Sequence, residues 1–235
     1  MSAIRFRTTS KGDLLHNSYI FRNPETLGTE MNNVVCSRLG TMLHLEIQKG
    51  KEAMKTSNFQ KYLGGTAACM KRQMMATKGC GKLTSNDTYF DDIQFGGVKN
   101  ADYAMAEGAY YCGKMKMIHK GFFLATLEKL MKDCPGGSYL VMKSTSIVHG
   151  GIPIMSIGYR YNYSKVIGFI ATEGGGSTQP GDSYLSQLPG IYSNVSVRPV
   201  FHPRFLCRSF NACNAIDSQN RMHQSDIALD KYWVT

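Results

Sequence analysis

The segment 88–117, TYFDDIQFGGVKNADYAMAEGAYYCGKMKM, constrains the fold more than any other part of the sequence. Its aromatic start predicts a short strand, the following residues a helix that ends at Gly108, and the last residues a second strand. Strand, helix, strand in this order argues for an α/β sheet. Asp91 and Asp92 then lie just past the carboxyl end of a strand, where α/β proteins commonly build their sites.

Two interpretations of this aspartate pair are open. A carboxylate at a strand end can be held rigidly beside others, as a site for two metal ions requires. The plainer alternative is an N-cap, because an aspartate before a helix accepts hydrogen bonds from free backbone amides.

The composition fits a protein with a substantial core. The chain has 235 residues, of which 43% are hydrophobic, so we expect one domain with an elaboration. No stretch approaches the roughly eighteen apolar residues of a membrane span, and the start of the chain lacks the apolar core of a secretory signal. The 27 basic and 17 acidic residues give a net charge of +10, with no dense basic run. This excess favours a polyanionic partner such as nucleic acid.

The seven cysteines are scattered and odd in number, which indicates reduced thiols and no disulfide framework. A zinc site of Cys207, Cys213, His202 and His223 can be drawn, but its spacing matches no familiar ligand pattern.

Elsewhere the residue pattern predicts short, alternating elements. Residues 34–36 and 42–47 form a hairpin with its turn at Leu39-Gly40, and residues 59–78 form a helix weakened by Gly64-Gly65, with methionines as core filler. A further helix carries an apolar stripe that ends before Pro135 and consists of Phe122, Leu124, Leu127, Leu130 and Met131. Short β-prone runs then predict an all-β insertion over about 138–200, whose glycine-rich TEGGGSTQPGDSY we interpret as a surface loop.

The last segment predicts a helix that starts near Asn214 or Ala215. Asp217, Arg221 and Gln224 lie roughly along one face of such a helix. An aspartate followed by a basic and a polar residue on one face can bring a carboxylate to a site while Arg221 and Gln224 reach a phosphate backbone.

Taken together, these segments resemble the piggyBac-type transposases, in particular the branch from protist, algal and oomycete genomes. The resemblance rests on segments in the same order along nearly the whole chain: PETLGTEMNNVVCSRLGTMLHLEIQKGKEAM, FDDIQFGGVKNA, GGSYLVMKS, GYRYNYSKVIGFIAT, GSTQPGDSY and NAIDSQNRMHQSDIALDKYWVT.

This resemblance implies an α/β fold: a ribonuclease-H-like mixed sheet with flanking helices and an all-β insertion. It also implies Mg²⁺ as cofactor, since the family binds two magnesium ions with three aspartates and excises and joins DNA at TTAA targets. By motif the second aspartate is Asp92, three residues before Phe95, with Asp91 as a neighbour that could also bind metal. The third is Asp217. The family implies DNA as partner, and the family together with the basic charge implies a nuclear location. Self-association as a homodimer is left open.

The family's first aspartate precedes a segment like MSAIRFRTT and is absent here, so the resemblance implies a truncated copy with a vestigial, inactive site. Other departures are Gly97 in place of the family's small residue after Phe-Gly, and the polar strand SNDTYF. The expected domains are a core at 1–137, the insertion at 138–205 and a return to the core at 206–235.

Two alternatives to an inactive transposase domain stay open. The first is a non-catalytic remnant that binds DNA or protein. The second is an active metal nuclease in which Asp91, Glu46 or an added partner replaces the lost carboxylate.

Overall fold

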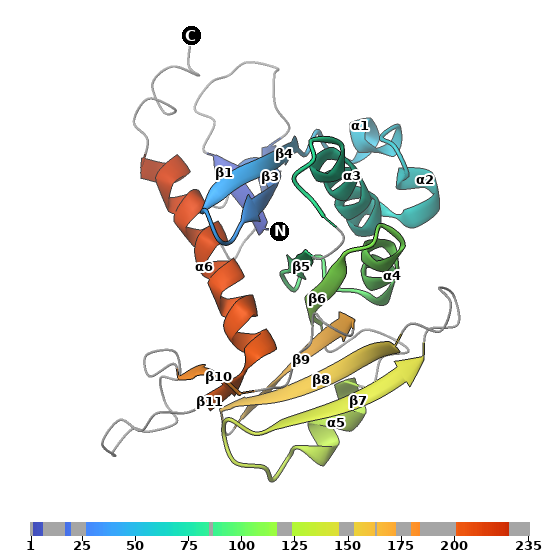
Figure 1. Ribbon diagram of the computed structural model, residues 1–235. Coiled ribbons are helices and arrows are strands. Elements are labelled where there is room, and N and C mark those ends of the chain that lie inside the picture. The colour runs from blue at the N-terminus through green and yellow to red at the C-terminus, as the bar shows by residue number, and fades with distance from the viewer. Residues whose placement is uncertain are drawn as a thin grey trace. The chain divides into compact units, whose positions relative to one another are not determined.

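The computed structural model describes residues 2–6, 17–19, 27–84, 87–116, 124–145, 153–162, 164–172, 180–183 and 201–225. The chain divides into two compact units (Figure 1). The first contains residues 1–82 and 211–235, and the second contains residues 83–210. The long helix α6 (Arg204–Ser225) begins in the second unit and ends in the first.

The first unit is built around strand β3 (Leu27–Cys36). Strands β1 (Ser2–Phe6), β2 (Asn17–Tyr19) and β4 (Thr41–Ile47) all pair with it in antiparallel orientation. The β3–β4 hairpin is confirmed, because residues 37–40 form the connecting turn and Gly40 has a φ of 64° in the left-handed region.

Three helices follow the hairpin: α1 (Lys51–Lys55), α2 (Gln60–Leu63) and α3 (Gly65–Gly79). The predicted helix over 59–78 is therefore present but interrupted at Gly64, whose φ of 77° and ψ of 170° are not helical. Met70 and Met74 are buried, which confirms that these methionines fill the core.

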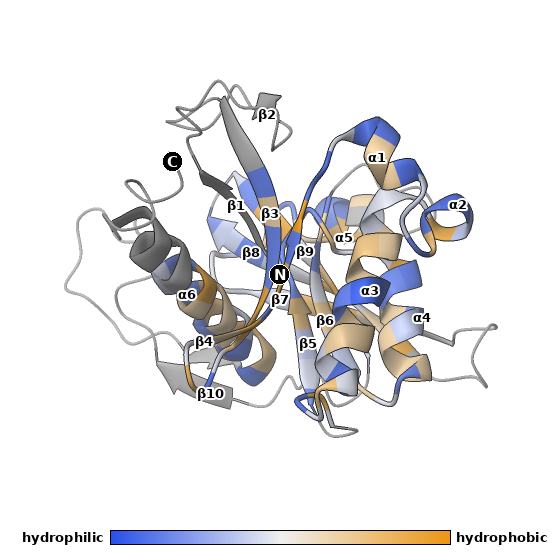
Figure 2. Cartoon of the chain, turned by 90° about the horizontal axis from the view of Figure 1, so that it is seen from above, coloured by the Kyte–Doolittle hydropathy of each residue, from blue (hydrophilic) through white to orange (hydrophobic). Residues whose placement is uncertain are grey.

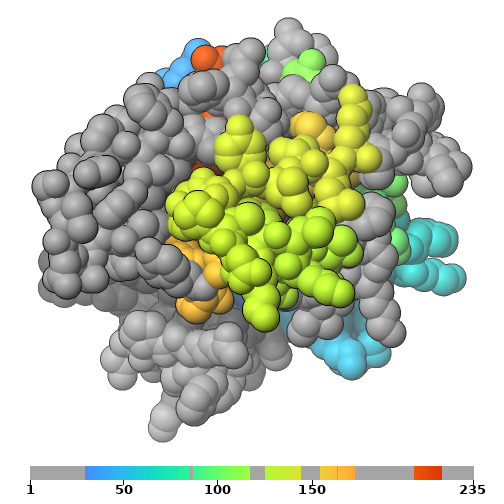
Figure 3. Space-filling view, turned by 90° about the horizontal axis from the view of Figure 1, so that it is seen from below, coloured from blue at the N-terminus to red at the C-terminus, as the bar shows by residue number. Residues whose placement is uncertain are grey.

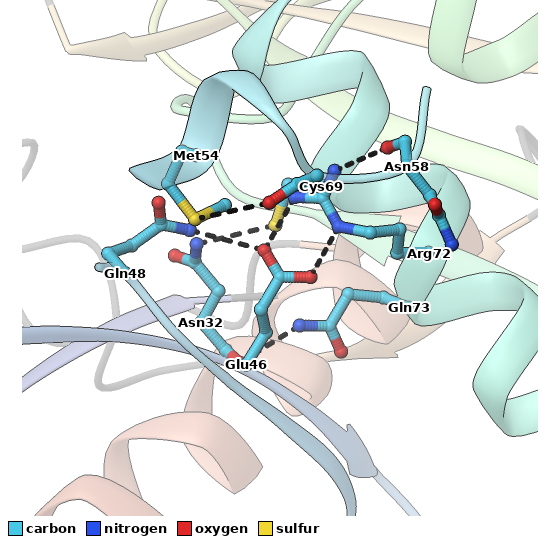
Figure 4. A network of polar contacts seen from close by, with 9 residues as sticks. Asn32, Glu46, Gln48, Met54, Asn58, Cys69, Arg72 and Gln73 are labelled. Carbon is cyan, nitrogen blue, oxygen red and sulfur yellow. Dashed lines mark hydrogen bonds and ion pairs between the residues drawn. The ribbon is translucent and has the colours of Figure 1, made fainter. Parts of the chain in front are cut away.

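A polar network joins α3 to the hairpin (Figure 4). Arg72 donates to both carboxylate oxygens of Glu46, at 2.8 and 2.6 Å, and its third contact is the backbone oxygen of Asn58 at 2.8 Å. Beside this pair, Asn32 donates to the sulfur of Cys69 at 3.3 Å. Burial raises the pKa of the Cys69 thiol to about 12, so this cysteine stays protonated. The network is a structural link within the first unit.

Replacing Arg72 with methionine should lower the free energy of unfolding by about 2 kcal/mol, because Glu46 would remain largely buried without its partner. The two side chains are only 14% and 15% exposed, so solvent replaces little of the lost contact. Urea unfolding measures the change. Lys55→Met breaks the exposed Lys55–Glu52 pair and serves as the control, with an expected loss below about 1 kcal/mol. Equal losses in the two variants would contradict this role.

The second unit contains a five-stranded sheet in the order β5-β6-β9-β8-β7. Its strands are β5 (Thr88–Asp91), β6 (Tyr110–Met115), β7 (Tyr139–Thr145), β8 (Pro153–Asn162) and β9 (Lys165–Thr172). β5 and β6 are parallel and are joined through α4 (Val98–Ala106), whereas the other pairs are antiparallel. Gly108, with a φ of 80°, follows α4 as predicted.

Both faces of this sheet are covered by helix. On one face Phe205 and Leu206 of α6 pack with apolar residues of β6, β8 and β9, and the rings of Phe205 and Phe169 meet edge to face at 5.5 Å. On the other face lies α5 (Leu124–Leu130). A Cβ atom at Gly158 of β8 would come within 2.7 Å of the Met131 sulfur, so glycine lets this helix approach closely.

The apolar stripe predicted for α5 is correct in part. Leu127 and Met131 are fully buried, one turn apart, but Leu130 is 59% exposed because it falls off the face that these two residues define. Phe122 and the Leu124 side chain lie outside the described residues. The surface formed by α5 and β7 is seen in Figure 3.

The β-rich insertion is present, but β7, β8 and β9 extend the sheet of β5 and β6 and do not form a separate layer. Part of the predicted glycine-rich loop, Pro180–Ser183, is strand β10, which pairs with β11 (Phe201–Pro203). NVSVRPV lies outside the described residues. The limits proposed for the three domains remain a prediction.

The start of α6 differs from the prediction by ten residues. The helix begins at Arg204, because Phe205, Leu206, Ala212 and Ile216 form a buried stripe that the intervening polar residues hid in the sequence. None of the described helices is long and apolar enough to cross a membrane.

Candidate functional site

The carboxyl end of β5 brings a buried acid into the second unit. Asp91, the last residue of the strand, is 6% exposed. Its Oδ2 atom accepts a hydrogen bond of 2.8 Å from the hydroxyl of Tyr111, which is fully buried on the neighbouring strand β6. Burial raises the pKa of the Asp91 carboxyl to about 6, and the Tyr111 hydrogen bond opposes this only in part.

The Tyr111 hydroxyl connects this acid to the loop after β5. Burial and the Asp91 charge hold the pKa of Tyr111 well above its ordinary value. The hydroxyl therefore stays protonated and donates a hydrogen bond to Asp91. The same oxygen accepts a hydrogen bond of 3.3 Å from the backbone N–H of Gly97. Gly113 makes room for this arrangement, since a Cβ atom there would lie 2.3 Å from the Tyr111 oxygen.

The loop after β5 is a tight turn across the backbone of β6. The backbone oxygen of Asp92 accepts hydrogen bonds of 2.9 Å from the N–H groups of both Phe95 and Gly96. A Cβ atom at Gly96 would lie 1.8 Å from the backbone oxygen of Lys114, so the turn requires glycine there. Asn100 of α4 donates to the backbone oxygen of Phe95, and the Phe95 side chain is buried.

Asp92 is presented by this turn at the surface of the unit. Its side chain is intermediate in exposure, and Oδ1 accepts a hydrogen bond of 2.6 Å from the N–H of Ile93. The N-cap of α4 is Gly97, without a side-chain cap, so the alternative that Asp92 caps this helix is wrong.

The third predicted carboxylate lies on α6. Asp217 is exposed and belongs to the first unit, whereas Asp91 and Asp92 belong to the second. Arg221 and Gln224 lie within the helix, but the structure does not describe their side chains. The convergence of Asp92 and Asp217 therefore stays a prediction.

The carboxylate oxygens of the predicted site are ligands of the kind that a hard divalent cation prefers. Carboxylate oxygens are the ligands that Mg²⁺ prefers, and Asp92 and Asp217 both offer one at the surface. Among the residues that the structure describes, no group of three or more His, Cys, Asp or Glu side chains could hold a metal ion. Glu46 is a poor replacement ligand because Arg72 occupies both of its oxygens.

Sequence reasoning missed the residues that hold the turn. The sequence pattern predicts Tyr111, Gly113 and Asn100 only as members of a strand or a helix. One signal was available: Tyr111 and Gly113 stand two apart, so they share a face of β6, and a glycine in a strand often marks a close approach.

The fold is a ribonuclease-H-like mixed α/β sheet with flanking helices, which confirms the predicted fold class. No protein-family model matches the chain, and no curated protein matches its sequence.

Among solved structures, the chain is similar to the piggyBac transposase in a cryo-EM structure of its synaptic complex with hairpin DNA. The TM-score is 0.61 at 13% sequence identity, and the match covers 95% of this chain. It covers 39% of the length of that transposase chain. At this level of identity the likeness shows a shared fold.

Proposed function

We propose that this chain is a piggyBac-type transposase domain that binds DNA through its phosphate backbone, with Asp92 and Asp217 as ligands for divalent cations. The observation that carries the proposal is the Asp92 carboxylate, held at the carboxyl end of β5 by a turn whose backbone is fixed at Gly96. The shared fold supports it. A strand end with a fixed turn is a suitable place for a metal ligand, because rigid placement is what such a site requires.

Asp217 is exposed on α6, where its carboxylate is accessible to an ion. Phe210 packs against the core cluster that includes Phe205 and Leu206. Asp217 follows Phe210 by seven residues, which is almost two helical turns, so both side chains leave nearly the same face of α6 about 10 Å apart. We propose that Asp217 binds the same ions as Asp92.

Magnesium, when bound, would activate a water or a DNA 3′-hydroxyl for in-line attack on a phosphodiester. Two carboxylates by themselves should hold such ions weakly. We therefore expect the 235-residue chain by itself to give little or no strand transfer. The branch assignment rests on the resemblance alone, and nuclear location rests on the resemblance and the basic charge; both are proposed on that basis.

DNA binding is supported by a concentration of positive charge. Residues 49–82, which span α1 to α3, contain eight lysines and arginines and a single acid, Glu52, a net charge of +7 within the chain's +10. Figure 2 shows hydrophilic residues over much of α1 and along one side of α3. Lys49 and Lys82 flank these helices, and Arg72 is already paired with Glu46, so the charge offered to a polyanion is that of the lysines. Such a surface attracts a polyanion through release of its counterions.

One face of α3 has two lysines at a spacing that suits contact with the phosphate backbone of DNA. Lys71, Met75 and Lys78 are spaced by four and three residues, so they share a face about a quarter turn around the helix from the buried Met70 and Met74. Lys71 and Lys78 are separated by about 10 Å along the helix axis, close to three base-pair steps of duplex DNA. Lys71 lies over the Phe59 ring, with its nitrogen 4.7 Å from the ring centroid.

A salt titration tests this surface. Replacing Lys71 and Lys78 with glutamine should make the dependence of DNA affinity on salt shallower. The negative slope of log affinity against log salt concentration for duplex DNA should shrink in magnitude by about two. The double variant Lys129→Gln and Lys132→Gln removes the same charge from exposed residues in and after α5 and should change the slope less. Equal changes in the two double variants would mean that binding follows net charge and not the α3 face.

The second candidate function is a non-catalytic domain that binds DNA or protein. It is favoured by the basic segment 49–82, because binding to a phosphate backbone needs positive charge and no metal ligand. Supercoiled DNA with Mn²⁺ separates the candidates. Nicking lost in Asp92→Ala and Asp217→Ala would show a retained nuclease site, whereas salt-sensitive binding unchanged by both substitutions, with no metal effect, would show a binding domain.

A further inference from the structure

We propose that Asp91 and Tyr111 are positioning residues, a buried pair that fixes the turn carrying Asp92 in the conformation needed to bind a cation. The inference rests on the proposed role of Asp92 as a ligand. It assigns to Asp91 a role different from that of a ligand itself.

A continuous chain of contacts links the pair to the turn. Asp91 accepts from the Tyr111 hydroxyl at 2.8 Å, and this hydroxyl accepts from the N–H of Gly97 at 3.3 Å. The turn therefore has its first residue next to Asp91 in the chain and its last residue bound to Tyr111. Both ends of the Asp92–Gly97 segment are fixed by one buried pair.

The pair is poorly explained as core packing. A buried carboxylate costs stability unless it is well bonded, and the Oδ1 atom of Asp91 has no hydrogen-bond partner in the described part of the chain. An apolar residue at position 91 would fill the site without that cost. What the carboxylate adds is an acceptor that orients the Tyr111 hydroxyl, so that its oxygen faces the Gly97 amide.

The surrounding residues also restrict the conformation of the Asp92–Gly97 turn. Gly113 leaves the space that the Tyr111 hydroxyl occupies, and Gly96 lets the turn lie against the backbone of β6. Asn100 donates to the backbone oxygen of Phe95, which anchors the middle of the turn from α4. Groups that orient a metal ligand in this way commonly change metal affinity by 10- to 100-fold when removed.

Amide hydrogen exchange tests the pair without any metal. Tyr111→Phe should reduce the protection of the Gly97 amide by about fivefold, because its acceptor is lost. Asp91→Leu should do the same, whereas Asp91→Asn keeps an acceptor for the hydroxyl and should retain protection. Tyr159→Phe removes a hydroxyl from another fully buried tyrosine and serves as the control. Unchanged protection in both Tyr111→Phe and Asp91→Leu would overturn the inference.

Manganese titration then links the turn to binding. Tyr111→Phe and Asp91→Leu should weaken Mn²⁺ binding about tenfold, with Asp91→Asn and Tyr159→Phe close to wild type. If wild-type binding depends on Asp92 but is unaffected by Tyr111→Phe, the positioning role is wrong and the proposed function stands. If the wild type binds no Mn²⁺, or if Asp92→Asn binds it equally, the proposed function fails, and the positioning of a cation ligand fails with it, even where the exchange data show that the pair holds the turn.

Discussion

Replacing Gly96 with alanine should destabilise the second unit by more than about 4 kcal/mol, a large part of the 5–15 kcal/mol that holds a typical domain together. The added Cβ atom would lie 1.8 Å from the backbone oxygen of Lys114. Backbone atoms of a paired strand cannot move aside as a flexible side chain can. Thermal unfolding followed by circular dichroism should show a large fall in Tm or an unfolded protein.

Gly97→Ala is the matched control for this prediction. A Cβ atom at Gly97 has no neighbour within 4 Å, and its φ of −177° suits any residue, so we expect a change below about 1 kcal/mol. Similar stabilities of the two alanine variants would mean that the turn does not lie against β6 as described.

Asp91→Asn should raise the free energy of unfolding at pH 7 by about 3 kcal/mol. The pKa of Asp91 rises from 3.8 to about 6 on folding, and a difference of about two units corresponds to about 3 kcal/mol. Asparagine keeps an acceptor for Tyr111. Its amide also faces a neighbourhood in which Asn100 Oδ1 has no partner among the described residues.

The pH dependence identifies the cause of this stabilisation. Because its pKa is raised by folding, Asp91 binds more protons in the folded state between about pH 4 and pH 6, so stability falls as pH rises through this window. The penalty is absent below pH 4 and complete above pH 6. Urea unfolding of the wild type and Asp91→Asn should therefore converge at low pH and diverge with rising pH. A difference that is constant from pH 4 to pH 7 would contradict the burial of an ionised Asp91.

The elements around the candidate site were predictable from local patterns. The strand at Thr88, the helix that ends before Gly108 and the next strand form through short-range preferences, and the Leu39-Gly40 turn is fixed by a left-handed glycine. The start of α6 was not predictable in this way. Its first turns are stabilised by the sheet that Phe205 and Leu206 cover, which is a tertiary contact.

The candidate site was likewise predictable only in part. That Asp91 and Asp92 stand at a strand end could be predicted, since the alternation of short elements sets the end of β5. That one is buried against Tyr111 and the other presented on a turn depends on the register of β5 with β6, where Tyr89 lies opposite Tyr111 and Asp91 opposite Gly113. Register between strands whose paired residues are 22 positions apart is set by packing, so the separate environments of the two aspartates could not be predicted from the sequence.

Manganese binding by the single and double variants of Asp92 and Asp217 tests the central proposal most directly. If both carboxylates hold the same ions, Asp92→Asn and Asp217→Asn should each weaken binding at least about tenfold. The double variant should then be little weaker than either single one. Asp133→Asn, an exposed aspartate after α5, should bind as the wild type does. Wild-type affinity in Asp217→Asn, or losses that simply add in the double variant, would contradict a shared site.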